Sequence, residues 1–136
     1  MSRLGRVLVA VPTVAVVIAA GTATVASATE GKPSGAPPSG VTCVSVTGAK
    51  ACYQSGSDKV WVKDTKANGQ SAAGTIKSLP SHTQWGRECF NYRGEAGGWV
   101  MCDFDVPNYQ PGDLWAVNNP FIGAQANVSI NTGPII

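Results

Sequence analysis

Four cysteines constrain the fold of this 136-residue chain more than any other feature of its sequence. They form two close pairs along the chain, and neither spacing resembles the CxxC motif of zinc sites. In small exported domains an even number of cysteines normally forms disulfides, because a modest core alone stabilises such a fold only weakly. The sequence therefore predicts two disulfides rather than a metal site.

The expected strand register favours one of the three possible pairings. If residues 47–48 form a two-residue turn, the first two cysteines lie opposite each other in an antiparallel hairpin. The same construction around residues 93–98 brings the last two cysteines together. Directly opposed residues in such strands are close enough for a disulfide bond. We therefore predict two hairpin-bridging disulfides, Cys43–Cys52 and Cys89–Cys102.

Residues 1–28 have the three regions of a secretory signal peptide. Arg3 and Arg6 precede an apolar run over residues 7–21, and small residues follow at 26–28. The apolar run is shorter than the roughly 20 residues of a membrane span. We therefore predict cleavage after Ala28, a secreted extracellular protein and no membrane anchor in its mature form.

Residues 29–40 are rich in Pro, Gly and Ser and contain no large apolar side chain, so we predict a flexible leader. The folded unit is then a single domain over residues 41–136. Removal of the signal peptide leaves as many basic as acidic residues in the chain. Nucleic-acid binders normally need a basic excess to neutralise phosphates, so the composition excludes that class of partner.

Short runs rich in Val, Ile, Trp and Thr alternate with turn residues along the whole domain, which predicts an all-β fold. Their number and spacing indicate a small antiparallel β-sandwich or a small barrel. The expected strands cover residues 41–46, 50–54, 59–63, 72–77, 88–92, 99–104, 114–117 and 126–130.

Alternation along the second predicted hairpin places four large side chains on one face, which must be buried or bind a ligand, and we expect it to be buried. These are Phe90, Tyr92, Trp99 and Met101. The strand at residues 59–63 is ambiguous. Its alternation directs Val60 and Val62 inward, which requires a loop over residues 64–71 that is longer than two residues. A tight turn at residues 68–69 would instead place Trp61 opposite Ile76 in the core.

No catalytic set is evident in the sequence. His82 is the single histidine and lies in a polar loop, no GxSxG motif provides a nucleophile, and all four cysteines are assigned to disulfides. Asp103 and Asp105 are expected on a solvated outer face, and calcium binding is the alternative for this pair. We predict a non-catalytic protein without a cofactor.

Four tryptophans are many for a domain of this size, and exposed aromatic rings can bind sugars or protein surfaces. Trp85 and Tyr109 are the candidates for exposed rings, because turn residues surround both of them. Trp61 is a third candidate for a binding residue.

The string Val60-Trp61-Val62-Lys63-Asp64-Thr65, the segment Ala67–Ala72 and the Cys89–Cys102 segment resemble small exported actinobacterial proteins of largely unknown function. The resemblance covers about residues 50–105. It implies a bacterial, extracellular, β-rich domain and identifies no catalytic residue.

The function expected from these features is binding of an extracellular protein or polysaccharide. One alternative is an inhibitor of a secreted hydrolase, in which the disulfides would rigidify a protruding loop such as residues 78–87. A small secreted hydrolase or toxin is a third possibility, and it would have to use His82 or the aspartates.

Overall fold

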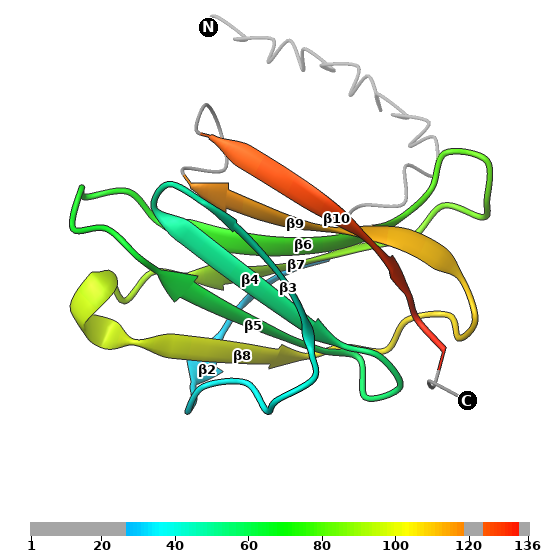
Figure 1. The fold of residues 1–136 in the computed structure, drawn as a ribbon, viewed down its shortest axis with the longest axis horizontal. Coiled ribbons are helices and arrows are strands. Elements are labelled where there is room, and N and C mark those ends of the chain that lie inside the picture. The colour runs from blue at the N-terminus through cyan, green and yellow to red at the C-terminus, as the bar shows by residue number, and fades with distance from the viewer. Residues whose placement is uncertain (1–26, 119–123, 134–136) are drawn as a thin grey trace, which may run out of the picture.

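The computed structural model describes residues 27–118 and 124–133, which form two five-stranded β-sheets packed face to face (Figure 1). A short 3₁₀ turn, η1 (Glu95–Gly97), lies between β7 and β8. The strands are β1 (Ser27–Glu30), β2 (Lys32–Pro33), β3 (Thr42–Val46), β4 (Ala49–Gln54), β5 (Lys59–Asp64), β6 (Ala72–Ser78), β7 (Gly86–Asn91), β8 (Trp99–Asp103), β9 (Pro111–Asn118) and β10 (Gln125–Asn131).

Sheet A has the strand order β1-β7-β6-β9-β10, and sheet B has the order β2-β8-β5-β4-β3. Neighbouring strands are antiparallel, except that β1 runs parallel to β7. The core lies between the sheets, and its largest fully buried apolar side chains are Tyr53, Ile76, Leu114, Val60, Val62 and Val100. The predicted all-β sandwich is confirmed.

All eight predicted strands are present, with ends shifted by a few residues at most. The β3–β4 hairpin has the predicted register, with Cys43 opposite Cys52 and a disulfide between them. Gly48 in the two-residue turn has a φ of 92°, which a residue without a side chain adopts at little cost. A local turn thus fixed this register.

The Cys89–Cys102 disulfide is also confirmed, but the prediction that it bridges a hairpin is wrong. Cys89 belongs to β7 in sheet A, whereas Cys102 belongs to β8 in sheet B. Each of these strands pairs with other partners, and residues 92–98 carry the chain from one sheet to the other. The bond therefore joins the two sheets across the core.

The predicted buried face of β7 and β8 is wrong for the same reason. A disulfide between sheets directs both cysteines inward, and alternation then buries Asn91 and Val100 beside them. The four side chains expected in the core point to the outer faces instead. Phe90, Trp99 and Met101 are partly exposed there, and Tyr92 is 59% exposed.

The ambiguity at β5 is resolved by the same crossing between sheets. β5 pairs with β4 and β8 in sheet B, and β6 lies in sheet A, so no tight hairpin joins them. Val60 and Val62 belong to the core cluster. Trp61 points to the outer face of sheet B, where it is opposite Cys52 and Met101 and only 6% exposed.

The structure also differs from the prediction at the start of the proposed flexible leader. β1 adds to the edge of sheet A, β2 adds to the edge of sheet B, and Gly31 links them with its N–H donating to the Phe90 carbonyl at 2.8 Å. Ordered residues thus begin before residue 41. The predicted signal peptide lies outside the described residues up to residue 26. Over the ranges described, no helix is long and apolar enough to cross a membrane.

Candidate functional site

A cleft of about 750 Å³ lies at one end of the sandwich, between two connections that pass from one sheet to the other. One connection follows β5 and the other follows β7, so both lie at the left end of the molecule in Figure 1. The cleft is lined by Asp64, Lys66, Ala67, Asn68, Gly69, Gln70, Ser71, Tyr92, Arg93, Gly94, Glu95 and Ala96.

Asn91 holds the wall formed by residues 92–98 in place. Its side chain is fully buried, and its Nδ2 donates to the Val62 carbonyl at 3.0 Å and to the Gly98 carbonyl at 2.9 Å. Its Oδ1 accepts from the Arg93 N–H at 3.0 Å. A buried amide with these three partners fixes where the chain leaves β7 and enters β8.

Tyr92 is the exposed aromatic residue of the cleft. Its ring stacks on Phe90 with the centroids 5.2 Å apart and the planes inclined by 6°. Stacking restricts the ring's rotation, so little side-chain entropy remains to be lost when a ligand binds to its other face.

The opposite wall is polar and is fixed by its own hydrogen bonds. Asp64 is 2% exposed, and its Oδ1 accepts from the Lys66 N–H at 3.0 Å. Asn68 accepts from the Gln70 N–H at 3.0 Å, and the Gln70 Oε1 accepts from Asn118 at 3.0 Å. These bonds order the loop before any ligand arrives.

The cleft therefore combines one aromatic ring with amides, hydroxyls and side chains of both charges. Lys66, Arg93 and Glu95 are exposed at its rim. Such a set can bind a sugar ring, whose apolar face packs on an aromatic side chain and whose hydroxyls need donors and acceptors. His82 follows β6 and so lies at the other end of the sandwich.

The predicted binding residues are not part of this cleft. Trp85 is 7% exposed and belongs to the core, where it lies against Gly112, so the prediction that it is exposed is wrong. Tyr109 is 61% exposed, as predicted, but it lies at the end of the sandwich opposite the cleft. Trp61 is covered on the outer face of sheet B.

The two aspartates proposed for calcium are both exposed. Asp103 is opposite Lys59 at the end of β8, and the backbone carbonyl of Asp105 accepts from Arg87 at 2.8 Å. Among the residues that the structure describes, no cluster of three or more His, Cys, Asp or Glu side chains is placed to hold a metal ion.

Two titratable groups with shifted pKa values lie outside the cleft. Burial raises the pKa of Tyr53 above its ordinary value, and the nearby Asp58 carboxylate, which accepts its hydroxyl at 3.1 Å, adds to this effect. Burial alone raises the pKa of Glu88 on the outer face of sheet A.

Sequence reasoning missed the cleft, because its two walls come from connections about 25 residues apart that were both read as hairpin turns. The unusual length and glycine content of residues 92–98 was the signal that a simple turn did not explain. In comparisons with known proteins, no family model, no curated protein and no solved structure matches the chain.

Proposed function

We propose that this protein is a secreted, non-catalytic binding domain that holds a saccharide in the end cleft. The observation that carries the proposal is the exposed ring of Tyr92, which is stacked on Phe90 and lines the cleft together with hydrogen-bonded polar residues. A rigid ring with ordered polar neighbours binds a sugar at a small entropic cost.

Export is supported by the signal-like residues 1–28 and by two disulfides, which persist in oxidising compartments. Cleavage after Ala28 would shorten β1 but would leave Thr29, Glu30 and all of β2 in the mature chain. Part of the edge strand β1 and the whole of the edge strand β2 would therefore remain after cleavage.

The experiment measures retention of the purified exported protein on insoluble cellulose, chitin, xylan and bacterial cell wall. Tyr92→Ala is expected to reduce retention on the bound polysaccharide about tenfold, which corresponds to the loss of one stacked ring. Tyr109→Ala is the matched control, because Tyr109 is 61% exposed at the opposite end whereas Tyr92 is 59% exposed.

Equal retention of Tyr92→Ala and the unchanged protein would contradict the proposal. A similar loss of retention in Tyr109→Ala would also contradict the proposal, because it would indicate that binding does not occur specifically at the cleft. Thermal unfolding of both variants, which change exposed side chains, should match that of the unchanged protein.

A second candidate function is inhibition of a secreted hydrolase, and one observation favours it. The exposed loop over residues 79–84 is braced from within by Gln84, whose Nε2 donates to the carbonyls of Leu79, Pro80 and His82 at 3.2, 3.2 and 2.8 Å. A pre-ordered loop suits a protease cleft. Unimpaired activity of a panel of secreted proteases at micromolar protein would exclude this candidate.

A further inference from the structure

Three side chains form a row across the outer face of sheet B, at the same end as the cleft. Lys50 in β4 is directly opposite Lys63 in β5, and Lys63 is directly opposite Trp99 in β8. All three are partly exposed. The Lys63 Nζ lies 5.9 Å from the centre of the Trp99 ring.

The Lys50–Lys63 pair is unfavourable for folding, because like charges directly opposite each other in a sheet repel. In the described part of the chain neither lysine forms an ion pair within 4 Å. Asp64 follows Lys63, but its carboxylate is buried and bonds to its own loop. Within the described residues the pair is thus not neutralised by a carboxylate, and the Lys63 ammonium lies over the Trp99 ring.

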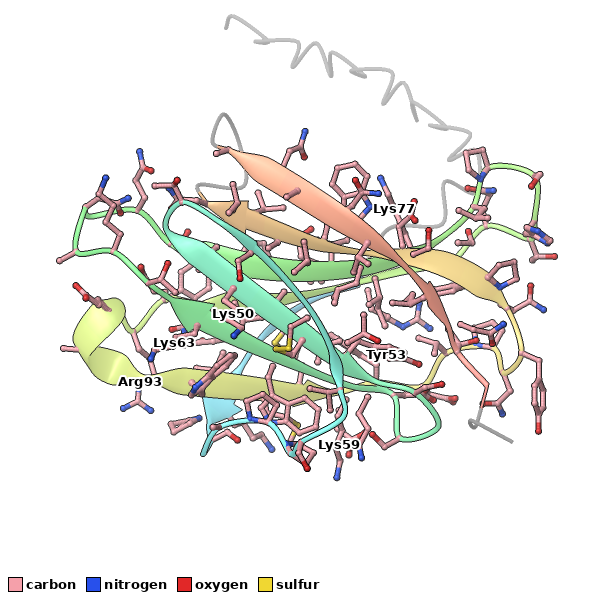
Figure 2. All side chains as sticks on the ribbon, in the orientation of Figure 1. Lys50, Tyr53, Lys59, Lys63, Lys77 and Arg93 are labelled. Carbon is pink, nitrogen blue, oxygen red and sulfur yellow. A yellow bond between two sulfur atoms is a disulfide. The ribbon has the colours of Figure 1, made fainter. Side chains whose placement is uncertain are left out.

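The row lies on the outer face of sheet B at the same end of the sandwich as the cleft, although its three residues do not themselves line the cleft. Asp64, the neighbour of Lys63, lines the cleft, and the carbonyl of Gly98, the neighbour of Trp99, accepts from Asn91. At the cleft rim Lys66 and Arg93 add two further cations, and Glu95 adds one carboxylate. Figure 2 shows Lys50, Lys63 and Arg93 gathered at this end of the sandwich.

We infer that the saccharide bound at the cleft is an acidic polysaccharide, whose carboxylate groups bind between Lys50 and Lys63 while a neighbouring sugar ring packs on Trp99. The inference rests on the proposed function and adds the class of ligand. A carboxylate between two ammonium groups removes their repulsion and forms charge-assisted hydrogen bonds. The indole face provides the same kind of contact with a sugar ring as Tyr92 does in the cleft.

A nucleic acid would offer similar charge, but the chain as a whole carries a formal charge of only +2, including two arginines within residues 1–28. The chain therefore lacks the overall basic excess that binding to a phosphate backbone requires. The charge pattern therefore favours a polymer with spaced carboxylates.

The experiment compares binding of polygalacturonate with binding of the same polymer after methyl esterification, which removes the charge and keeps the sugar chain. We expect the unchanged protein to bind the acidic polymer about tenfold more tightly, as charge-assisted hydrogen bonds imply. High salt should abolish this difference between the two polymers.

Lys50→Glu is the most informative variant, because it should weaken binding of the acidic polymer without lowering the stability of the fold. It should lose the preference for the acidic polymer, while its unfolding temperature stays the same or rises, because the introduced carboxylate would attract Lys63. Lys77→Glu is the matched control: it makes the same charge change on sheet A, where Lys77 Nζ lies 4.4 Å from the centre of the Trp115 ring (Figure 2). It should leave the preference intact.

If the unchanged protein and Lys50→Glu both bind the two polymers equally well, the assignment of an acidic ligand is refuted. The proposed function is not affected by that result. Absence of binding to any polysaccharide would refute the proposed function and this inference with it. Equally tight binding of single-stranded DNA, lost in Lys50→Glu, would overturn the assignment to a glycan.

Discussion

Replacing the two disulfides by alanines, one at a time, tests how the sandwich is held together. The Cys89–Cys102 bond joins sheet A to sheet B, with the two residues 0% and 3% exposed. The Cys43–Cys52 bond lies within one hairpin of sheet B, and Cys43 is exposed. The two bonds therefore differ in burial far more than in loop length.

Loop closure alone predicts nearly equal effects. With sequence separations of 13 and 9, the entropic contributions are about 2.9 and about 2.6 kcal/mol. The difference in burial makes the two effects unequal, because removing a buried sulfur, which is about the size of a methylene, costs about 0.8 kcal/mol. The bond between the sheets loses two buried sulfurs and the hairpin bond loses one, so the expected totals are about 4.5 and about 3.4 kcal/mol.

The assay is urea unfolding of each double variant at one pH and temperature, with the unchanged protein as reference. Cys89→Ala/Cys102→Ala should lower the free energy of unfolding by about 1 kcal/mol more than Cys43→Ala/Cys52→Ala, or about 4–8 °C in unfolding temperature. An equal or larger loss in the hairpin variant would refute the reasoning, since it would mean that burial between the sheets adds nothing.

Two further predictions concern single residues. Because burial raises the folded-state pKa of Glu88 above its ordinary value of 4.5, the contribution of Glu88 to stability should be greatest below that pH and should fall as the pH rises through the folded pKa. Glu88→Gln should therefore unfold at a higher temperature than the unchanged protein at pH 7, and an unchanged or steeper pH dependence would contradict this. An added Cβ at Gly31 would overlap the Val100 side chain, so Gly31→Ala should lower the free energy of unfolding by about 1–3 kcal/mol. Gly35→Ala, in open space in the same segment, should have no such effect, and equal results for the two variants would contradict the close packing of Gly31.

The sequence was a good guide wherever a local rule decided the structure. Strand positions followed from the period of two, and the β3–β4 register followed from the two-residue turn at Gly48. Both cysteine pairs were also predicted correctly. None of these predictions required knowledge of which strands lie in the same sheet.

The errors arose where the chain crosses between sheets. β5 with β6 and β7 with β8 are neighbours in sequence, and each pair was expected to form a hairpin. Seven or so residues can either return the chain along one sheet or carry it to the other, and their composition does not distinguish the two outcomes. Once β7 and β8 were placed in one sheet, the wrong face of both strands followed, including Phe90 and Trp99 in the core.

The inward face of β7 links the stability of the sandwich to the shape of the candidate site. Cys89 and Asn91 are two residues apart and both fully buried, so they point into the same space between the sheets. Cys89 bonds covalently to Cys102 in β8, and Asn91 donates to the carbonyl of Val62 in β5 and to that of Gly98, the residue before β8. Any change that lets the sheets move apart therefore also displaces residues 92–98, and with them Tyr92. Loss of the buried disulfide should thus weaken the proposed saccharide binding even in molecules that remain folded.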